Sequence, residues 1–263
     1  MQLPRYIQFE TNTKCDAHCW FCPHDMMKPR AGMSNELIQN IIREVVPHSN
    51  DVCPFLMQEP MLEPRLPAIL QAIKHVNPDT VTWVYTTGRH MTEHMMHELV
   101  DRQDLNKLVF SYANSTPRSR EMLMKLIEYR GMRLFPQVEI HCIDGECGTN
   151  IPHVGRDIVR RVPLDTFHGT VSPRIQPSIG PNTVRKPCSR LWETLNIHSN
   201  GVVVPCCVDW EEEIKLGKLD YDNGVTAHKI WNSYKFMALR QMHLDRQWDQ
   251  IPMCKDCQTW RWM

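Results

Sequence analysis

The sequence predicts an α/β fold with parallel strands, and three observations point to it. Segments rich in β-branched and aromatic residues alternate with segments of helical periodicity over the first two-thirds of the 263-residue chain. Strand–helix alternation is typical of parallel strands joined by right-handed crossovers. Apolar residues make up 42% and charged residues 23%, as in an ordinary globular protein. Five or six such units form an open sheet or a partial barrel.

Five strands and four intervening helices are predicted. The strands span 5–11, 52–57, 80–85, 107–112 and 137–142. Apolar residues recur at helical spacing through 37–46, 66–76, 95–99 and 122–127. Ser34, Thr92 and either Ser115 or Thr116 are placed to cap helices. Because ligand sites of such folds lie where strands end, the residues just after each strand are site candidates.

The last third of the chain is organised differently. Proline and glycine interrupt the periodicity at 166–187, which predicts an irregular linker between a core at 1–165 and a smaller domain at 188–263. Residues 195–204 suggest a hairpin that turns at 199–201. Residues 226–242 suggest one helix.

Composition narrows the class of protein. No apolar run is long enough to span a membrane and no signal peptide is evident, so we expect a cytoplasmic protein. A formal net charge of zero gives no reason to expect nucleic-acid binding. Eleven cysteines in such a chain favour metal or cluster ligation over disulfides. They cluster near residue 20 and beyond residue 187.

The first cluster is Cys15, Cys19 and Cys22, spaced C-x3-C-x2-C in the loop after the first strand. Three thiolates hold three irons of a cubane cluster and leave the fourth iron open for a small chelating ligand. A zinc site is the alternative, with His18 or His24 as the fourth ligand.

This triplet, its position and the aromatic Phe21 before its last cysteine resemble the radical S-adenosylmethionine (SAM) superfamily. The resemblance implies a partial (β/α)6 TIM-like barrel. It also implies that SAM chelates the open iron of a [4Fe–4S] cluster. Reductive cleavage then gives a 5′-deoxyadenosyl radical that abstracts a substrate hydrogen atom.

The resemblance also assigns roles to three further residues. It places Phe21 against the adenine. Glu59, in the stretch Met57-Gln58-Glu59-Pro60, would hold the SAM amino group, although the glycines usual before this Glu-Pro pair are absent. Ser111 would contact the ribose or the carboxylate. A simple turn and an ordinary strand-end hydroxyl are the alternatives for Glu59 and Ser111.

The second cysteine cluster has the pattern C-x12-G-x4-C, from Cys188 to Cys206, followed by Cys254-x2-Cys257. It resembles the SPASM/twitch domains of radical SAM enzymes, which implies a small C-terminal α+β domain with one auxiliary iron–sulfur cluster. Those four cysteines are the expected ligands. Cys207 can replace Cys206, because neighbours on a strand point opposite ways. A structural zinc ribbon on the same thiolates is the alternative.

A fully ligated auxiliary cluster suits electron acceptance, which favours dehydrogenation of a small molecule. Size and domain order are similar to the 2-deoxy-scyllo-inosamine dehydrogenase type. An electron donor such as flavodoxin or ferredoxin is the expected protein partner. We expect no association with a membrane.

Three alternatives remain open at this stage. One is a redox-neutral epimerase in which Cys142, Cys147 or Cys207 donates a hydrogen atom. Another is a peptide-modifying radical SAM enzyme. The third is a non-catalytic zinc-binding protein. The general base is also open, with His141, Asp144 and Arg174 as candidates.

Overall fold

A computed structural model of the chain describes residues 2–19, 22–112, 115–143, 158–162, 184–255 and 257, with only the backbone for 143 and 159–162. Its strands form one nine-stranded sheet in the order β6-β5-β4-β3-β2-β1-β7-β8-β9. The strands are β1 (Tyr6–Phe9), β2 (Asp51–Cys53), β3 (Val81–Thr86), β4 (Lys107–Ser111), β5 (Gln137–Ile143), β6 (Ile158–Val162), β7 (Thr194–Ile197), β8 (Val202–Val204) and β9 (Gly217–Lys218).

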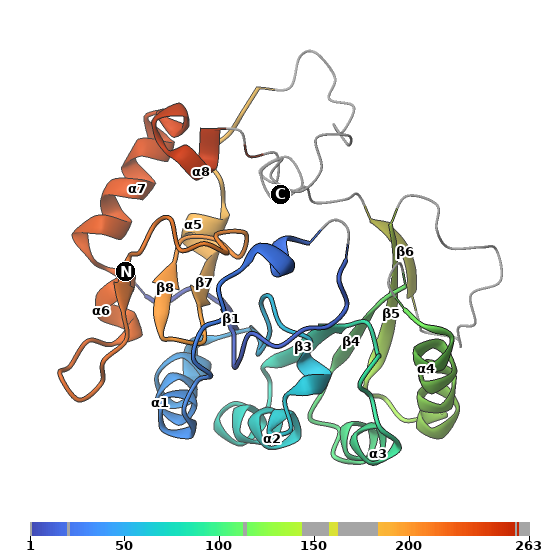
Figure 1. The fold of residues 1–263 in the computed structure, drawn as a ribbon. Helices are drawn as coiled ribbons and strands as arrows, with labels where there is room; N and C mark the ends of the chain where they lie inside the picture. The colour runs from blue at the N-terminus through green and yellow to red at the C-terminus, as the bar shows by residue number, and fades with distance from the viewer. Residues whose placement is uncertain are drawn as a thin grey trace.

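The main helices lie along one side of this sheet (Figure 1). These four are α1 (Asn35–Val45), α2 (Leu66–Val76), α3 (Glu93–Asp101) and α4 (Pro117–Arg130). The C-terminal helices lie elsewhere and are α5 (Arg190–Glu193), α6 (Ala227–Trp231), α7 (Tyr234–Leu244) and α8 (Pro252–Lys255). Short 3-10 turns are η1 (Pro23–Met26), η2 (Val46–His48), η3 (Pro60–Leu62) and η4 (Trp248–Gln250). Among the described residues, no helix has both the length and the apolar character needed to cross a membrane.

The predicted α/β fold with a parallel, partial-barrel core is confirmed. Neighbouring strands from β6 to β7 pair in parallel, whereas β8 pairs antiparallel with both β7 and β9. All five predicted strands are present, but β2 ends at Cys53, before the predicted end at 57. Pro54 follows at once, and proline has no N–H to donate to a ladder. The prediction did not include β6.

The predicted helix caps are also confirmed. Ser34 accepts a hydrogen bond from the Leu37 N–H at 3.1 Å, and Thr92 caps α3 in the same way. Of Ser115 and Thr116, the cap is Thr116, and Pro117 follows it as the first residue of α4. These side chains satisfy N–H groups that the first helical turn leaves without partners.

The single helix predicted at 226–242 was wrong, because the segment forms two helices. Thr226 caps α6, and Asn232 ends it with φ −100° and ψ 11°. Ser233 then takes an extended conformation, and its hydroxyl accepts from the Phe236 N–H at 3.4 Å to start α7. A second cap inside an apolar pattern therefore divides the helix.

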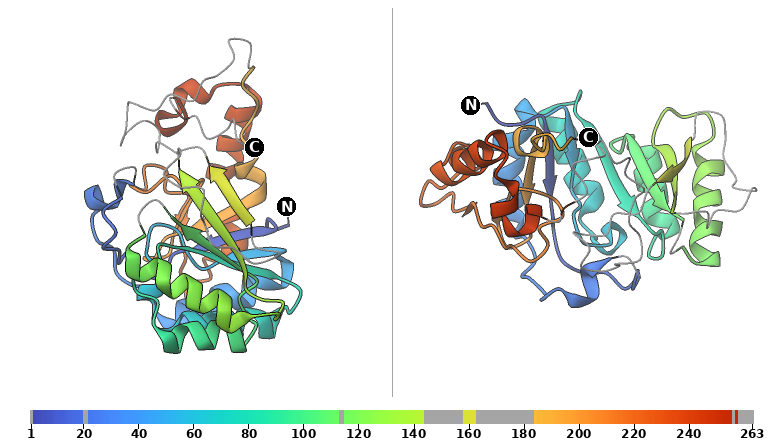
Figure 2. Two further views of the ribbon diagram at one scale, coloured as in Figure 1. Left: turned by 90° about the vertical axis from the view of Figure 1, so that its right-hand side faces the viewer. Right: turned by 90° about the horizontal axis from the view of Figure 1, so that it is seen from above.

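The C-terminal segment packs directly on the N-terminal one. The Glu44 carboxylate of α1 accepts hydrogen bonds from the backbone N–H groups of Ala227 and His228, both at 2.9 Å, at the start of α6. The Trp231 indole donates to the Gln2 carbonyl at 2.9 Å. Figures 1 and 2 show α6 and α7 beside the β7–β8 edge of the sheet. The division at 166–187 stays a prediction, because 163–183 lie outside the described residues.

We predict that Gly88→Ala destabilises the fold more than Gly224→Ala. Both glycines have left-handed backbones, with φ +71° and +70°, which costs an alanine about 1–2 kcal/mol. A Cβ on Gly88 would also lie 2.6 Å from the Phe110 ring, whereas on Gly224 its nearest contact is the flexible Lys229 amino end at 3.4 Å. Overpacking adds about 1–3 kcal/mol at Gly88 only. Urea unfolding of both variants measures the difference, and equal losses would contradict it.

Candidate active site

The N-terminal cysteine motif forms the loop that follows β1. Cys15, Cys19 and Cys22 are half-buried thiols without disulfides. The Cys22 N–H donates to the Cys19 carbonyl at 2.8 Å, and His18 takes a positive φ of 45°, so the loop turns tightly between the cysteines. The three thiols interact electrostatically with one another. Burial raises the pKa of Cys15 to about 11 and that of Cys22 to about 12.

The segment after β2 holds the start of this loop in place. The Gln58 side chain accepts from the Thr11 N–H at 2.9 Å and donates to the Thr11 hydroxyl at 2.6 Å. The Glu59 N–H donates to the Lys14 carbonyl at 2.8 Å. Gln58 and Glu59 are almost fully buried. The position of the cysteine loop therefore depends on the loop that follows the neighbouring strand.

The Glu59 carboxylate lies beside the cysteine loop but is engaged by the end of β3. One oxygen accepts from the Thr86 hydroxyl, and the other accepts from the Thr87 N–H at 2.9 Å and the Thr87 hydroxyl at 2.8 Å. Its charge acts on the Cys15 thiol. This arrangement joins the loops after β2 and β3 around the motif, while the expected contact of Glu59 with the SAM amino group stays a prediction.

Both histidines weighed as a fourth zinc ligand have other partners. His18 Nδ1 lies 2.8 Å from Asp25, and His24 Nε2 lies 2.8 Å from the Thr13 carbonyl. Most of the His18 side chain is exposed to solvent, at 72%. The donor set that remains is three sulfurs, which fits the cubane with an open iron better than tetrahedral zinc.

One face of the sheet points away from α1–α4, and we call it the inner face. Five aromatic or ionisable side chains on this face contact one another in a row. They are Tyr6, Trp83, Tyr85, Glu139 and His141. The Tyr6 and Trp83 rings stack at 5.6 Å, the Trp83 and Tyr85 rings meet edge to face at 5.4 Å, and the Tyr85 and His141 rings at 5.2 Å. His141 Nε2 lies 2.7 Å from Glu139 Oε1. The inner face thus combines an aromatic row with a carboxylate–imidazole pair.

The other predicted side chains fall in three places. Ser111 ends β4 opposite His141 in the sheet register and is half-buried. Cys142 follows His141 and therefore faces the helices, fully buried in the apolar core under α3 and α4. It is also disulfide-bonded, so its position does not favour hydrogen-atom donation. Phe21, Cys147 and the candidate bases Asp144 and Arg174 lie outside the described residues.

The C-terminal cysteines gather beside α5 and α8. Cys188 interacts electrostatically with Cys206 and Cys257, and Cys254 interacts with all three. Burial raises the pKa of Cys188 to about 12. Within the described residues, no three such ligands are close enough to hold a single metal ion. Four thiolates are the usual ligand set of an iron–sulfur cluster.

The sulfurs of Cys206 and Cys207 lie close together, because they are hydrogen-bonded to each other and both contact Arg190, but they act on different groups. Cys206 acts on Cys188 and Cys254, whereas Cys207 acts on Tyr6 of the inner face. The Arg190 guanidinium lies between them, with Nη1 2.6 Å from Cys207 Sγ and 3.6 Å from Cys206 Sγ. The geometry therefore favours Cys206 over Cys207 as the fourth ligand. Sequence reasoning missed Arg190, because no local pattern marks it.

A buried ion pair links the two cysteine regions. Arg30, after the N-terminal motif, bonds Glu10 at the end of β1 at 2.9 Å, and their side chains are 10% and 0% exposed. Arg30 also donates to the Trp210 carbonyl at 3.0 Å, shortly after Cys207. Glu10 accepts from the Ser199 N–H at 3.2 Å. The loops that carry the two thiol sets therefore share buried contacts.

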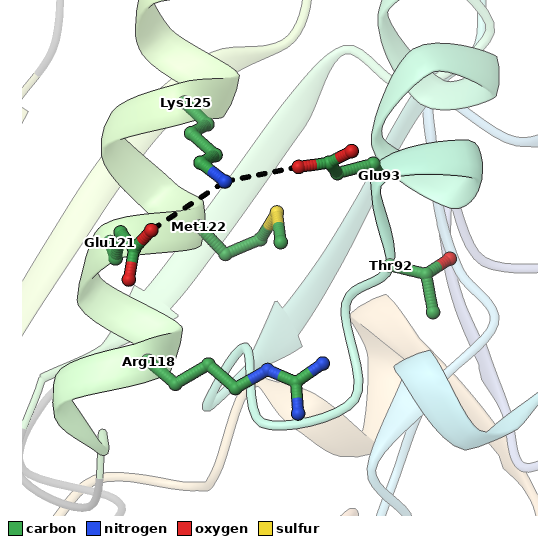
Figure 3. A pocket seen from close by; sticks show the side chains of 6 residues that line it. All are labelled: Thr92, Glu93, Arg118, Glu121, Met122 and Lys125. Carbon is green, nitrogen blue, oxygen red and sulfur yellow. Dashed lines mark hydrogen bonds and ion pairs between the residues drawn. The ribbon is translucent and has the colours of Figure 1, made fainter.

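A hollow on the opposite side of the sheet is not part of this site. Figure 3 shows it between α3 and α4, with Lys125 bound to Glu93 at 3.0 Å and to Glu121 at 3.5 Å. It contains no cysteine and none of the predicted site residues. Lys125 is paired there with two acidic side chains, and we assign the chemistry to the inner face.

Comparison with known proteins agrees with this architecture. Residues 188–258 match the SPASM family, described as an iron–sulfur cluster-binding domain. The chain is 20% identical over 255 residues to the S-adenosyl-L-methionine-dependent 2-deoxy-scyllo-inosamine dehydrogenase of Niallia circulans, covering 95% of this chain and 91% of that protein.

Solved structures show the same fold. BtrN in complex with AdoMet and 2-DOIA superposes with a TM-score of 0.71 at 18% identity, covering 97% of this chain and 93% of that one. Streptococcus suis SuiB bound to S-adenosylmethionine gives a TM-score of 0.63 at 14% identity, covering 91% and 68%. The cysteine triplet after β1 resembles that of radical SAM enzymes, residues 188–258 match the SPASM domain, and the chain shares its fold with these structures.

Proposed function

We propose that the chain cleaves SAM reductively and dehydrogenates a small hydroxylated molecule on the inner face of its sheet. One observation supports the proposal: the segments that carry the two thiol sets lie at opposite ends of the paired strands β1 and β7, and Tyr6 of β1 belongs to this face. The N-terminal set follows the carboxyl end of β1. Cys188 and Cys206 lie near its amino end, because β7 pairs in parallel with β1 and starts beside Tyr6. A substrate on the inner face would lie between them.

The residues present fit two iron–sulfur clusters. Cys15, Cys19 and Cys22 would hold the SAM-binding [4Fe–4S] cluster, and Cys188, Cys206, Cys254 and Cys257 the auxiliary one. When bound, SAM and the clusters supply a radical that takes a hydrogen atom from carbon and an acceptor for one electron. Two electrons and two protons leave the substrate, so a proton acceptor is still required.

The His141–Glu139 pair supplies that acceptor in our proposal. His141 takes the proton of the substrate hydroxyl, while Glu139 accepts a hydrogen bond from the opposite ring nitrogen and stabilises the imidazolium. Lys107 lies 3.5 Å from the second Glu139 oxygen and favours its ionised form. Tyr85, half-buried beside His141, provides a flat apolar surface for a ring and excludes water.

The comparisons support a hydroxylated cyclic substrate. The Niallia circulans relative is named for dehydrogenation of 2-deoxy-scyllo-inosamine and matches almost the full length of this chain. A peptide is the second candidate, because SuiB is solved with a precursor peptide. We further propose a cytoplasmic enzyme with flavodoxin or ferredoxin as electron donor.

Deuterium transfer tests the proposed function. The anaerobically reconstituted protein is reduced with dithionite and given SAM with ring-deuterated 2-deoxy-scyllo-inosamine and related cyclic polyols and sugars. We expect deuterium in 5′-deoxyadenosine and an oxidised product. Deuterium transfer with solvent hydrogen in an unoxidised product would indicate epimerisation instead. Unlabelled 5′-deoxyadenosine from every polyol would contradict the proposed substrate class.

Cys206→Ala and Cys207→Ala should differ in iron content. We expect Cys206→Ala to lose the auxiliary cluster, about four irons per chain, because its thiol is the one near Cys188 and Cys254. Cys207→Ala should keep its iron, since the thiol that acts on Cys188 and Cys254 is that of Cys206. Iron and sulfide analysis with absorption spectra measures this. Loss of the cluster in Cys207→Ala alone would reverse the assignment.

His141→Ala should separate hydrogen abstraction from oxidation. A general base contributes about a hundredfold or more to rate, so the ratio of oxidised product to 5′-deoxyadenosine should fall at least tenfold while deuterium transfer continues. His94→Ala is the control, because that side chain is 83% exposed on α3. A proportional loss of both products in His141→Ala would indicate structural damage and not loss of a base.

A further inference from the structure

Arg190 places a half-buried positive charge beside the C-terminal thiols. It is the first residue of α5, and it comes two residues after Cys188. Its Nη1 lies 2.6 Å from Cys207 Sγ and 3.6 Å from Cys206 Sγ. An arginine guanidinium is always protonated in proteins. The guanidinium therefore stays charged next to the cysteines.

The partners of this charge are unusual for a half-buried arginine. A buried cation is costly unless it is paired and hydrogen-bonded. Within the described part of the chain, the Arg190 side chain has no carboxylate within ion-pair distance, and its hydrogen bonds go to sulfur. The nearby acid, Glu193, accepts instead from the Ser189 hydroxyl at 2.7 Å. The charge of Arg190 is thus directed at the cysteines.

A charge in this position acts on the redox equilibrium of a cluster. Reduction by one electron makes an iron–sulfur cluster more negative. A fixed positive charge therefore stabilises the reduced form, and hydrogen bonds to the cluster sulfurs act in the same direction. The effect is larger in a buried site, where the effective dielectric is lower than in water.

We propose that Arg190 is a positioning residue of the auxiliary cluster, which donates a hydrogen bond to the ligand Cys206 and raises the reduction potential of the cluster. Cys207 is then the sulfur that does not bind the cluster, and it accepts the other hydrogen bond of the guanidinium. The proposal rests on the proposed function in one respect, that the C-terminal thiols hold an iron–sulfur cluster. The role of Arg190 is to make the cluster a better acceptor for the electron that the substrate loses.

The test isolates the auxiliary cluster. The triple variant Cys15→Ala/Cys19→Ala/Cys22→Ala removes the SAM-binding cluster, and the reduction of the remaining one is followed by electron paramagnetic resonance during a redox titration. Adding Arg190→Gln should shift the equilibrium at least tenfold towards the oxidised form, about 59 mV for one electron. Arg190→Lys, which keeps the charge but not the planar donor, should give an intermediate shift.

Controls make each outcome informative. Arg102→Gln removes a surface charge bound to Glu98 and should leave the potential unchanged. Arg190→Gln with full iron content and an unchanged potential would overturn the proposal. If Arg190→Gln binds no iron, Arg190→Lys decides: a lowered potential supports the proposal, and an unchanged one overturns it. If the triple variant binds zinc and no iron, the C-terminal cysteines do not hold an iron–sulfur cluster, and that result contradicts the proposed function itself.

Discussion

The parallel pairing of β1 with β7 is the constraint on which the candidate site depends. Its register runs from Tyr6 opposite Thr194 to Phe9 opposite Ile197. Because the strands are parallel, the thiols around the start of β7 lie near the amino end of β1, and the N-terminal motif follows its carboxyl end. The length of one strand therefore separates the two thiol sets. Tyr6 of the inner face lies on that strand.

Buried polar contacts keep this geometry in place. Glu10 and Arg30 join the end of β1 to the loops of both thiol sets, and Glu44 holds α6 against α1. Removing one partner of a buried pair costs about 3–5 kcal/mol, because the other charge is left without compensation. These contacts join the C-terminal segment to the core, so the spacing of the two thiol sets is a property of the whole fold.

Local sequence signals predicted the parts of the structure that depend on local physics. Ser34 and Thr92 cap helices as expected, and the hairpin turns at Gly201, whose φ is +82°. Features that depend on distant partners could not be predicted. The inward orientation of His141 follows from the sheet register, and Arg190 depends on a loop sixteen residues later in the chain. The division of the 226–242 helix was missed because an apolar pattern hid the second cap.

The central claim is that three cysteines after β1 hold a cluster with one iron open to SAM. Electron paramagnetic resonance of the anaerobic, dithionite-reduced protein tests it most directly. With about eight irons per chain from two cubanes, the account predicts a [4Fe–4S] signal that changes when SAM is added, and no such change when the three cysteines are replaced by alanine. A reduced signal from the unaltered protein that is indifferent to SAM would contradict the account.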